Sequence, residues 1–431
     1  MTCRRLFAAC ASWLSLVLFA AIVAAQDQVA EAGPEEWVAK AVGALCHDAP
    51  LDAEKAAEAL GAALIEDAPA QRGGLVFRLK RRFALPGGAE MQGEHFRPGD
   101  RLRRFSAAYF ARTKDHGLQP VLQGLADGEC ALRSGRRIRR ESDAKVFLDQ
   151  LDGDLETLRW SETLQAPWPE GRDPGGPRIA LIDSGLPYDL PIFRDRLARG
   201  LDGAPQGYDF WDLDPYPYDA DVSRGAFLPI RHGGPVASIL VREAPSAALI
   251  PFRYPRPDPN RFGALVARAA AAGARVIAAP LGSARREDWM AFEAALRAHP
   301  EILAIVSAGN SGRDLDRAPI WPAALDLPNI VTVTSADDFG RLARGSNWGA
   351  ETVDLMLPAE NQPVIDFRGA KSRASGSSYA VPRLAALAAR LLAKRPELTM
   401  EELKQAIFSR AAPSPYEPGK LRVGWIPDPA Q

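Results

Sequence analysis

Apolar residues recur at helical spacing near the start of the chain. Between residues 35 and 66 two such sets, first Trp37, Val38, Ala41 and Leu45 and then Ala57, Leu60 and Leu64, predict two helices, with Asp52 a plausible cap for the second. The next hundred residues hold short apolar or alternating runs broken by Gly, Pro and Asp, a pattern typical of strands and turns. The clearest runs are Leu75–Phe83, Phe105–Ala111 and Pro120–Ala126. We therefore expect a small α+β domain over residues 26–150.

Beyond a stretch rich in Pro and Gly, residues 166–177, the pattern changes. Short, continuously apolar runs now alternate with helical patterns. These runs are Ile179–Ile182, Ala248–Phe252, Val276–Ala279, Ile302–Val306 and Ile330–Val333. Continuous apolar strands that alternate with helices indicate a parallel sheet covered on both faces. We expect a doubly wound, mostly parallel α/β domain over residues 151–431, with its working residues just beyond the carboxyl ends of strands.

The composition allows a sizeable core and indicates no polyanionic partner. The 431 residues are 47 % hydrophobic and carry a formal net charge of -1, so nothing draws the whole chain to nucleic acid or to an anionic membrane. Residues 71–145 hold 17 Lys or Arg against 8 Asp or Glu, but acidic flanks offset this stretch. We interpret it as a charge-compensated domain surface rather than a polyanion site.

The N-terminus has the features of an export signal. Two arginines precede an apolar run, Leu6–Ala25, that ends in small residues. We expect residues 1–25 to be a signal peptide that is cleaved, which would leave a secreted or periplasmic protein without a membrane segment. An uncleaved anchor is the alternative, since the run is long enough to span a bilayer. A lipidated Cys10 is disfavoured because too few apolar residues precede it.

Cleavage would leave two cysteines, Cys46 and Cys130. In an oxidising compartment an even pair favours a disulfide over two free thiols. Neither cysteine has a metal-ligating neighbour at useful spacing, so we expect no metal site there.

Four polar residues stand at the ends of predicted elements in the α/β domain. Asp183 follows the first strand, where a carboxylate can orient an imidazole, and His232 precedes two glycines and a helical run. The other histidine of this half, His299, lies at a helix end and is disfavoured as a base. Ser378 begins a long helix at its positive pole, and Asn310 ends a strand in a turn. Each alone is more typical of a turn or cap, so the evidence is their combination.

The segments around these residues resemble the subtilisin family of serine peptidases. The matching motifs are Ile179–Gly185, His232–Ser238, Ser307–Gly312, Ser346–Pro358 and Ser375–Pro382. The resemblance spans roughly residues 155–425 and implies a subtilisin-like fold and a serine endopeptidase acting on proteins or peptides. It implies that His232 takes the proton of Ser378 while Asp183 holds the imidazole. It also implies that Asn310 stabilises the oxyanion, that no cofactor is needed, and that the protein is a monomer.

Some positions depart from the family's pattern. Gly234 and Ser377 stand where the family usually has threonine. Pro280, Leu281 and Gly282 resemble the wall that pairs with the substrate backbone, and we expect them to bind substrate. Proline removes an amide donor from that wall, so the shape of the specificity pocket stays open.

Calcium is possible but not indicated. The helix after His232 lacks the loop insertion that holds a strong calcium site in many relatives. The acidic run from Asp209 to Asp221 could bind calcium, but we interpret it as a solvated loop and expect no metal site.

Two other functions stay open. A catalytically silent subtilisin-fold binding module would account for the altered substrate wall, although all four catalytic positions are present. An α/β-hydrolase esterase would use Gly376–Ala380 as its nucleophile elbow, but that fold needs its acid and histidine after the serine. The role of residues 26–150 is likewise open between a removed propeptide and a retained accessory domain. The basic run Arg136–Arg140 could be a processing site or a solvated loop.

Overall fold

The computed structural model of the chain describes residues 32–47, 52–99, 101–114, 117–414 and 416–431. The expected signal peptide lies outside the described residues, and so do Cys10 and the expected cleavage site after Ala25. The chain divides into two compact units, one formed by the described residues up to Gly135 together with Asp152–Thr157, the other by Arg136–Leu151 and Leu158–Gln431. In the described part, no helix has the length and apolar character that crossing a membrane requires.

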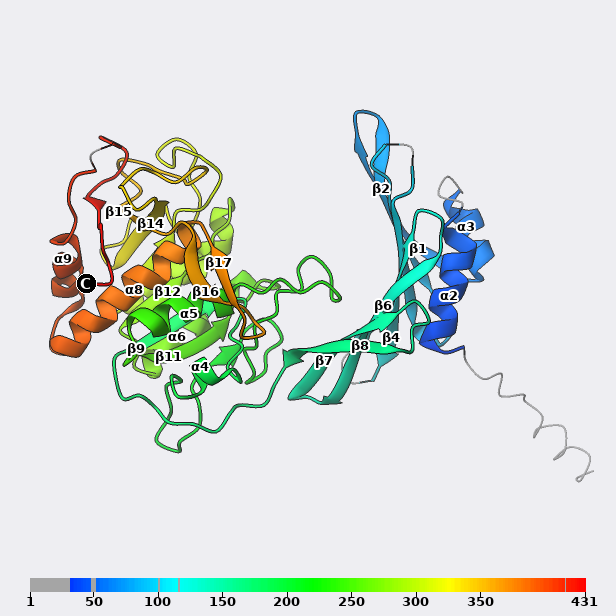
Figure 1. Ribbon diagram of the computed structural model, residues 1–431, viewed down its shortest axis with the longest axis horizontal. Helices are drawn as coiled ribbons and strands as arrows, with labels where there is room; N and C mark the ends of the chain where they lie inside the picture. The colour runs from blue at the N-terminus through cyan, green and yellow to red at the C-terminus, as the bar shows by residue number, and fades with distance from the viewer. Residues whose placement is uncertain (1–31, 48–51, 100, 115–116, 415) are drawn as a thin grey trace, which may run out of the picture. The chain divides into compact units, whose positions relative to one another are not determined.

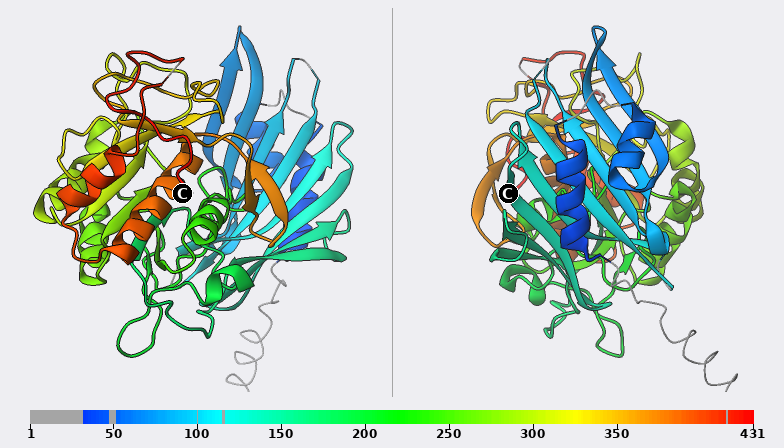
Figure 2. Two further views of the ribbon diagram at one scale, coloured as in Figure 1. Left: turned by 60° about the vertical axis from the view of Figure 1, so that its left-hand side comes forward. Right: turned by 90° about the vertical axis from the view of Figure 1, so that its right-hand side faces the viewer.

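The first unit packs two helices on antiparallel strands (Figures 1 and 2). Its elements are α2 (Pro34–Leu45), α3 (Ala53–Leu60), β1 (Ala63–Arg72), β2 (Leu75–Ala84), β3 (Glu90–Phe96), β4 (Arg104–Thr113) and β5 (Gly117–Asp127). Each of these strands pairs with the next in antiparallel fashion. The helix α2 lies against β4 and β5, and Gly124 allows this approach, since a Cβ there would lie 2.5 Å from Val38.

The predicted elements of this unit are largely confirmed. Asp52 caps α3, with its side chain accepting a hydrogen bond from the Glu54 amide at 2.9 Å. The helical prediction is wrong at its end, because α3 stops at Gly61 in a left-handed conformation (φ 69°) and Leu64 lies in β1. The disulfide between Cys46 and Cys130 is present and closes a separation of 84 residues.

Antiparallel strands continue past residue 150. They are β6 (Leu132–Ser142), β7 (Lys145–Asp152) and β8 (Leu158–Gln165), and β8 pairs with β7. The basic run Arg136–Arg140 belongs to β6 and is therefore not a loop. Within it, Arg139 donates to Asp149 at 2.8 Å. Polar and charged side chains interrupt the apolar positions of β6 and β8, which hides these strands from a search for apolar runs.

The second sheet is parallel throughout. Its strands are β9 (Arg178–Asp183), β10 (Tyr208–Asp209), β11 (Ala248–Arg253), β12 (Val276–Ala279), β13 (Leu303–Ser307), β14 (Ile330–Ala336), β15 (Leu355–Pro358) and β18 (Gly424–Trp425). Their order is β10-β11-β9-β12-β13-β14-β15-β18, and each neighbouring pair is parallel. A short antiparallel hairpin, β16 (Gln362–Ile365) and β17 (Lys371–Ala374), stands apart from it.

Helices cover both faces of this sheet, as predicted (Figure 1). They are α4 (Pro191–Arg194), α5 (Gly233–Glu243), α6 (Phe262–Ala271), α7 (Met290–Ala298), α8 (Ser377–Lys394) and α9 (Met400–Phe408). Ile179 and Leu181 of β9 share a core with α5, α8 and α9, whereas Ala180 and Ile182 share one with α6 and α7. Successive residues of a strand point to opposite faces, so a strand buried on both must be apolar throughout.

The strand order reverses at β9, which has β11 on one side and β12 on the other. The chain passes from β9 through α5 to β11, and then through α6 to β12 on the opposite flank. Such a reversal opens a crevice outside the carboxyl ends of the strands. Asp183 is the last residue of β9, and Pro280 directly follows β12. The fold thus brings these two predicted site segments to one edge of the sheet.

Candidate active site

Asp183 and His232 are in direct contact. The imidazole Nδ1 lies 2.7 Å from Asp183 Oδ1 and 2.9 Å from Oδ2. Asp183 is buried, while 30 % of the His232 side chain is exposed. The Ser184 amide also donates to Asp183 Oδ1, at 2.7 Å. Because the carboxylate is acceptor-only when ionised, Nδ1 must carry the proton and Nε2 is left to accept one.

The pKa of His232 is raised above its ordinary value of 6.5. Burial lowers this pKa, but the negative charge of Asp183 and its hydrogen bond oppose burial, and the charges of Asp219 and Asp221 add to that effect. The carboxylates therefore favour the imidazolium form. They would stabilise a histidine that accepts a proton during a reaction.

Ser378 lies in the first turn of α8, half-buried, as the sequence predicts. Its Oγ donates to the carbonyl oxygen of Pro280 at a long 3.4 Å. In the described part of the chain, no hydrogen bond joins Ser378 to His232. The ring of the next residue, Tyr379, lies 6.0 Å from the imidazole centroid. The serine thus lies near the histidine, but its hydroxyl points toward the Pro280 carbonyl.

Asn310 is held beside this serine. Its Oδ1 accepts hydrogen bonds from the Ser377 amide at 2.9 Å and from Ser377 Oγ at 3.0 Å. A backbone N–H can only donate, so the oxygen of the Asn310 amide faces Ser377 and the Nδ2 donor faces away. Gly376 permits this approach, since a Cβ there would lie 3.1 Å from Asn310 Oδ1. Gly376 also has a φ of 127°, which side-chain-bearing residues rarely adopt.

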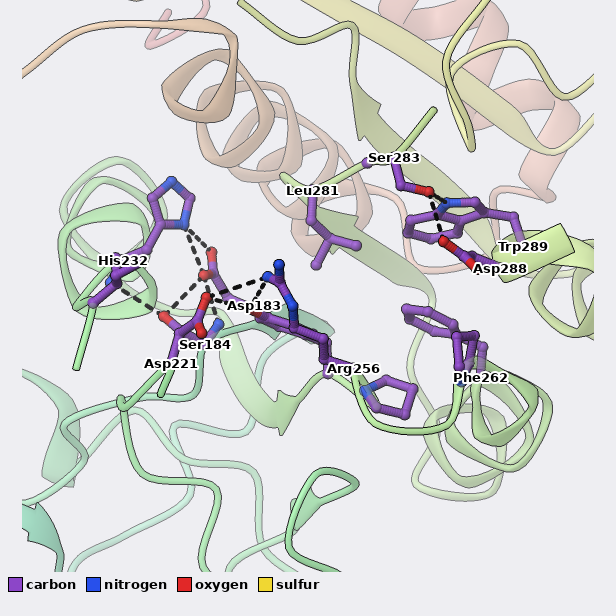
Figure 3. Close-up of a pocket in the computed structure, with 15 residues that line it drawn as sticks. Asp183, Ser184, Asp221, His232, Arg256, Phe262, Leu281, Ser283, Asp288 and Trp289 are labelled. Atoms are coloured by element: carbon purple, nitrogen blue, oxygen red, sulfur yellow. Dashed lines mark hydrogen bonds and ion pairs between the residues drawn. The ribbon is translucent and has the colours of Figure 1, made fainter. Parts of the chain in front are cut away.

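A cavity of about 380 Å³ adjoins the histidine. Figure 3 shows His232 and Asp183 at one end and Phe262 and Trp289 at the other, with Leu281 between them. Gly282 also lines the cavity, so two of the three predicted wall residues face it. Pro280 is buried and contacts Ser378 instead.

The acidic run is not the solvated loop that we expected. Asp209, Asp219 and Asp221 are buried. Asp209 and Asp212 pair with Arg253, and burial raises the pKa of Asp209 to about 6. Among the described residues, no three His, Cys, Asp or Glu side chains are grouped so as to hold a metal ion. The absence of calcium stays a prediction.

Residues 175–425 match the model of the subtilase family, which is more than half of the chain. The chain belongs to the subtilase family. The matched region includes Gly376–Ala380, so these residues belong to a subtilase and the α/β-hydrolase alternative is not kept.

Three curated relatives resemble this subtilase. It is 29 % identical over 258 residues to a thermophilic serine proteinase of Bacillus sp. (strain AK1), covering 57 % of this chain and 58 % of the relative. It is 27 % identical to the halolysin-like extracellular serine protease Nep of Natrialba magadii, covering 54 % and 43 %. It is 31 % identical to the minor extracellular protease Vpr of Bacillus subtilis (strain 168), covering 46 % and 26 %. The chain thus spans under two thirds of the length of each.

Two solved structures also resemble this subtilase. One is a cold-adapted subtilisin-like serine proteinase, with 24 % identity, a TM-score of 0.47, and coverage of 61 % of this chain and 93 % of that chain. The other is a lanthipeptide protease, with 20 % identity, a TM-score of 0.48, and coverage of 58 % and 85 %.

The sequence did not reveal every residue that surrounds His232. Asp219 accepts hydrogen bonds from the backbone at the start of α5, yet it lies 13 residues before the histidine in the run interpreted as a loop. Arg231 directly precedes His232 and is nearly buried, with 6 % of its side chain exposed. One signal was available in the sequence. Gly234 stands where the family usually has threonine, which indicates that the turn before α5 differs from that of its relatives.

Proposed function

We propose that the chain is an exported serine endopeptidase that hydrolyses peptide bonds in protein or peptide substrates. In this proposal Ser378 is the nucleophile, His232 is its general base, and Asp183 orients the imidazole. The observation that carries the proposal is the contact of His232 Nδ1 with Asp183 Oδ1 at 2.7 Å, at the carboxyl end of β9. Family membership supports it, because the matched region contains all three residues.

The hydrogen-bond pattern gives the direction of proton transfer. With its proton held on Nδ1 by Asp183, His232 accepts the Ser378 proton at Nε2 while Ser378 Oγ attacks the substrate carbonyl carbon. The imidazolium then gives that proton to the leaving amine. Water repeats the attack on the acyl-enzyme with the same base. Ser378 must first turn from the Pro280 carbonyl, and catalytic hydrogen bonds are often long before substrate binds.

Asn310 is proposed as the donor to the oxyanion. The hydrogen bonds from Ser377 to Oδ1 fix the orientation of the amide, so that Nδ2, its donor, can point to the oxygen that gains negative charge. The Ser378 amide, in the first turn of α8, is the second proposed donor. Donors that are fixed before reaction stabilise the transition state without reorganising.

The substrate would lie along Pro280, Leu281 and Gly282. Proline cannot donate to a substrate carbonyl at position 280, so the pairing with substrate backbone should be weaker there. The apolar part of the cavity, which includes Leu281, Phe262 and Trp289, favours substrates with an apolar side chain at the matching position. No cofactor enters this proposal.

Export is proposed from the N-terminal apolar run and from two relatives. The run Leu6–Ala25 fits a signal peptide. Two of the relatives are named extracellular proteases. Secretion or a periplasmic location would follow, and it would also suit the disulfide between Cys46 and Cys130.

A catalytically silent binding module is the second candidate, favoured by the turned Ser378 hydroxyl and by Pro280. A fluorophosphonate probe and a fluorogenic peptide separate the two. The active enzyme should be labelled at Ser378 and should hydrolyse the peptide. Ser378→Ala and His232→Ala should lower turnover on the order of a millionfold, the loss that subtilisin itself shows. An unlabelled wild type without turnover would support the silent module, and variants within tenfold of wild type would refute the triad.

A further inference from the structure

Asp219 is a fully buried carboxylate, 0 % exposed, that the proposed reaction does not use. Its Oδ1 accepts a hydrogen bond from Ser184 Oγ at 2.6 Å and one from the His232 amide at 3.2 Å. Oδ1 also accepts from the Gly233 amide at 3.3 Å, and Oδ2 accepts from the Gly234 amide at 2.8 Å. Four donors therefore converge on the two oxygens of one carboxylate.

These contacts fix the turn that carries the imidazole. The helix α5 begins at Gly233, and His232 is its N-cap residue, but the His232 side chain makes no capping hydrogen bond. The first amides of a helix lack partners within it and carry partial positive charge. Asp219 accepts from all three of the first amides, and Ser184 Oγ, which itself donates to Asp219, shares the His232 amide at 3.1 Å and the Gly233 amide at 3.0 Å. The position of the His232 backbone, and hence the aim of its ring toward Asp183, therefore depends on Asp219 together with Ser184.

The glycine at position 234 fits this arrangement. A Cβ there would lie 2.9 Å from Pro187 Cγ and 3.1 Å from Asp219 Oδ2. The threonine that the family usually has would collide with both. Gly234 and Asp219 thus form a matched pair, in which the absent side chain leaves room for the carboxylate.

Arg231 connects Asp219 to strand β8. Its guanidinium donates to the main-chain carbonyl oxygen of Asp219 and to that of Thr163, at 2.9 Å. It lies 3.6 Å from Glu162, whose side chain is 10 % exposed. The guanidinium also lies over the ring of Phe367, 4.9 Å from its centroid. A buried arginine held on several sides keeps the residue before His232 in one place.

We propose that Asp219 is a positioning residue for His232, and that Arg231 holds it in place against β8. This inference rests on the proposed function, since it takes His232 as the catalytic base. It makes β8, which precedes the subtilase match, a structural part of the working site. Asp219 itself touches no substrate atom in the proposed reaction.

The charge of Asp219 acts on the pKa of His232, and this pKa can be measured separately from the stability of the fold. The ionisable groups that act on or face His232 are Asp183 of β9, Asp219 and Asp221 of the preceding loop, and Tyr379 of α8. All three carboxylates raise the pKa of His232. Replacing Asp219 by asparagine removes one negative charge and should lower that pKa.

The test uses the full chain in two parallel backgrounds. In Ser378→Ala protein, the His232 Nδ1–H resonance is titrated by proton NMR with and without Asp219→Asn, which needs no turnover. In active protein, kcat and KM are measured for the same variant. The exposed Asp338→Asn is the matched control, because it makes the same chemical change away from the site.

We expect a lower His232 pKa in Asp219→Asn and a kcat reduced roughly tenfold to a hundredfold with little change in KM, since misplaced catalytic groups cost about that much. The control should leave both unchanged. A folded Asp219→Asn with unaltered His232 pKa and kcat overturns the proposal. If Ser378→Ala still hydrolyses the substrate, the proposed function is overturned. The NMR titration then still tests whether Asp219 acts on His232.

A second variant decides the outcome if Asp219→Asn does not fold. Arg231→Lys keeps the charge but cannot reach both the Asp219 and the Thr163 carbonyls. It should lower kcat with KM unchanged, whereas the exposed Arg317→Lys should not. A folded Arg231→Lys with the kcat of wild type would refute the role of the link to β8.

Discussion

Gly376→Ala should damage the proposed oxyanion site without changing a side chain of the proposed triad. The new Cβ would lie 3.1 Å from Asn310 Oδ1 and 3.3 Å from Nδ2, closer than the 3.4 Å at which ordinary contacts begin. Asn310 must therefore move by a few tenths of an ångström or more. Its hold on the Ser377 amide, now 2.9 Å long, would be strained at the same time.

Two effects set the size of the loss. A side chain at a φ of 127° should cost about 1 to 3 kcal/mol of stability. Complete removal of an oxyanion donor costs roughly a hundred- to a thousandfold in kcat, as measured in subtilisin itself. A displaced donor should lose part of this, so we expect a kcat roughly ten- to a hundredfold lower, or about 1.4 to 2.7 kcal/mol in the barrier.

Gly419→Ala is the matched control. Gly419 also has a positive φ, 74°, but a Cβ there would meet no atom within 4 Å. Both variants should melt at a lower temperature, and only Gly376→Ala should lose kcat on a fluorogenic peptide, with KM nearly unchanged. If Gly376→Ala keeps the kcat of wild type, Asn310 is not placed by this glycine and the reasoning is wrong.

Three further predictions concern the same site. Because His232 must be neutral to act as a base and its pKa is raised, kcat/KM should fall as the pH drops through a midpoint above 6.5, and a midpoint below 6.5 would contradict the electrostatic argument. Asn310→Ala should lower kcat roughly a hundred- to a thousandfold, the subtilisin value, while a defect in KM alone would speak against an oxyanion role. EDTA should leave the melting temperature nearly unchanged, since Asp209 and Asp212 pair with Arg253, and a large fall would reveal a structural metal ion.

The sequence predicted the parallel sheet well because its strands are buried on both faces. Runs such as Ile179–Ile182 must then be apolar at every position, so such strands can be recognised from the local sequence alone. The contact of Asp183 with His232 was predicted from the resemblance of their two motifs to the subtilisin family, because a polar residue at the end of an element is by itself more typical of a turn or cap. The half-exposed strands β6 and β8 were missed because polar and charged residues interrupt their few apolar positions.

Other features depend on contacts between distant residues, which no local pattern contains. Leu64 fits the helical spacing, but α3 ends at Leu60, and the strand that follows Gly61 pairs with β2. Asp219 appeared to be one of several loop carboxylates. Only the fold places it under the helix that begins 14 residues later. Composition alone does not distinguish a carboxylate that is buried against residues distant in the sequence from one that is solvated.

The contacts of β8 bear on whether the N-terminal region is removed. Glu162 and Thr163 hold Arg231 beside His232, and the Ala166 carbonyl just after β8 accepts a hydrogen bond from the buried Tyr188 at 2.5 Å. A cut near residue 150 would leave these contacts but would break β7, which ends at Asp152 and pairs with β8 along most of its length. A cut in the 166–177 stretch would separate Arg231 from both partners. Either cut would therefore remove part of the structure that supports the proposed base.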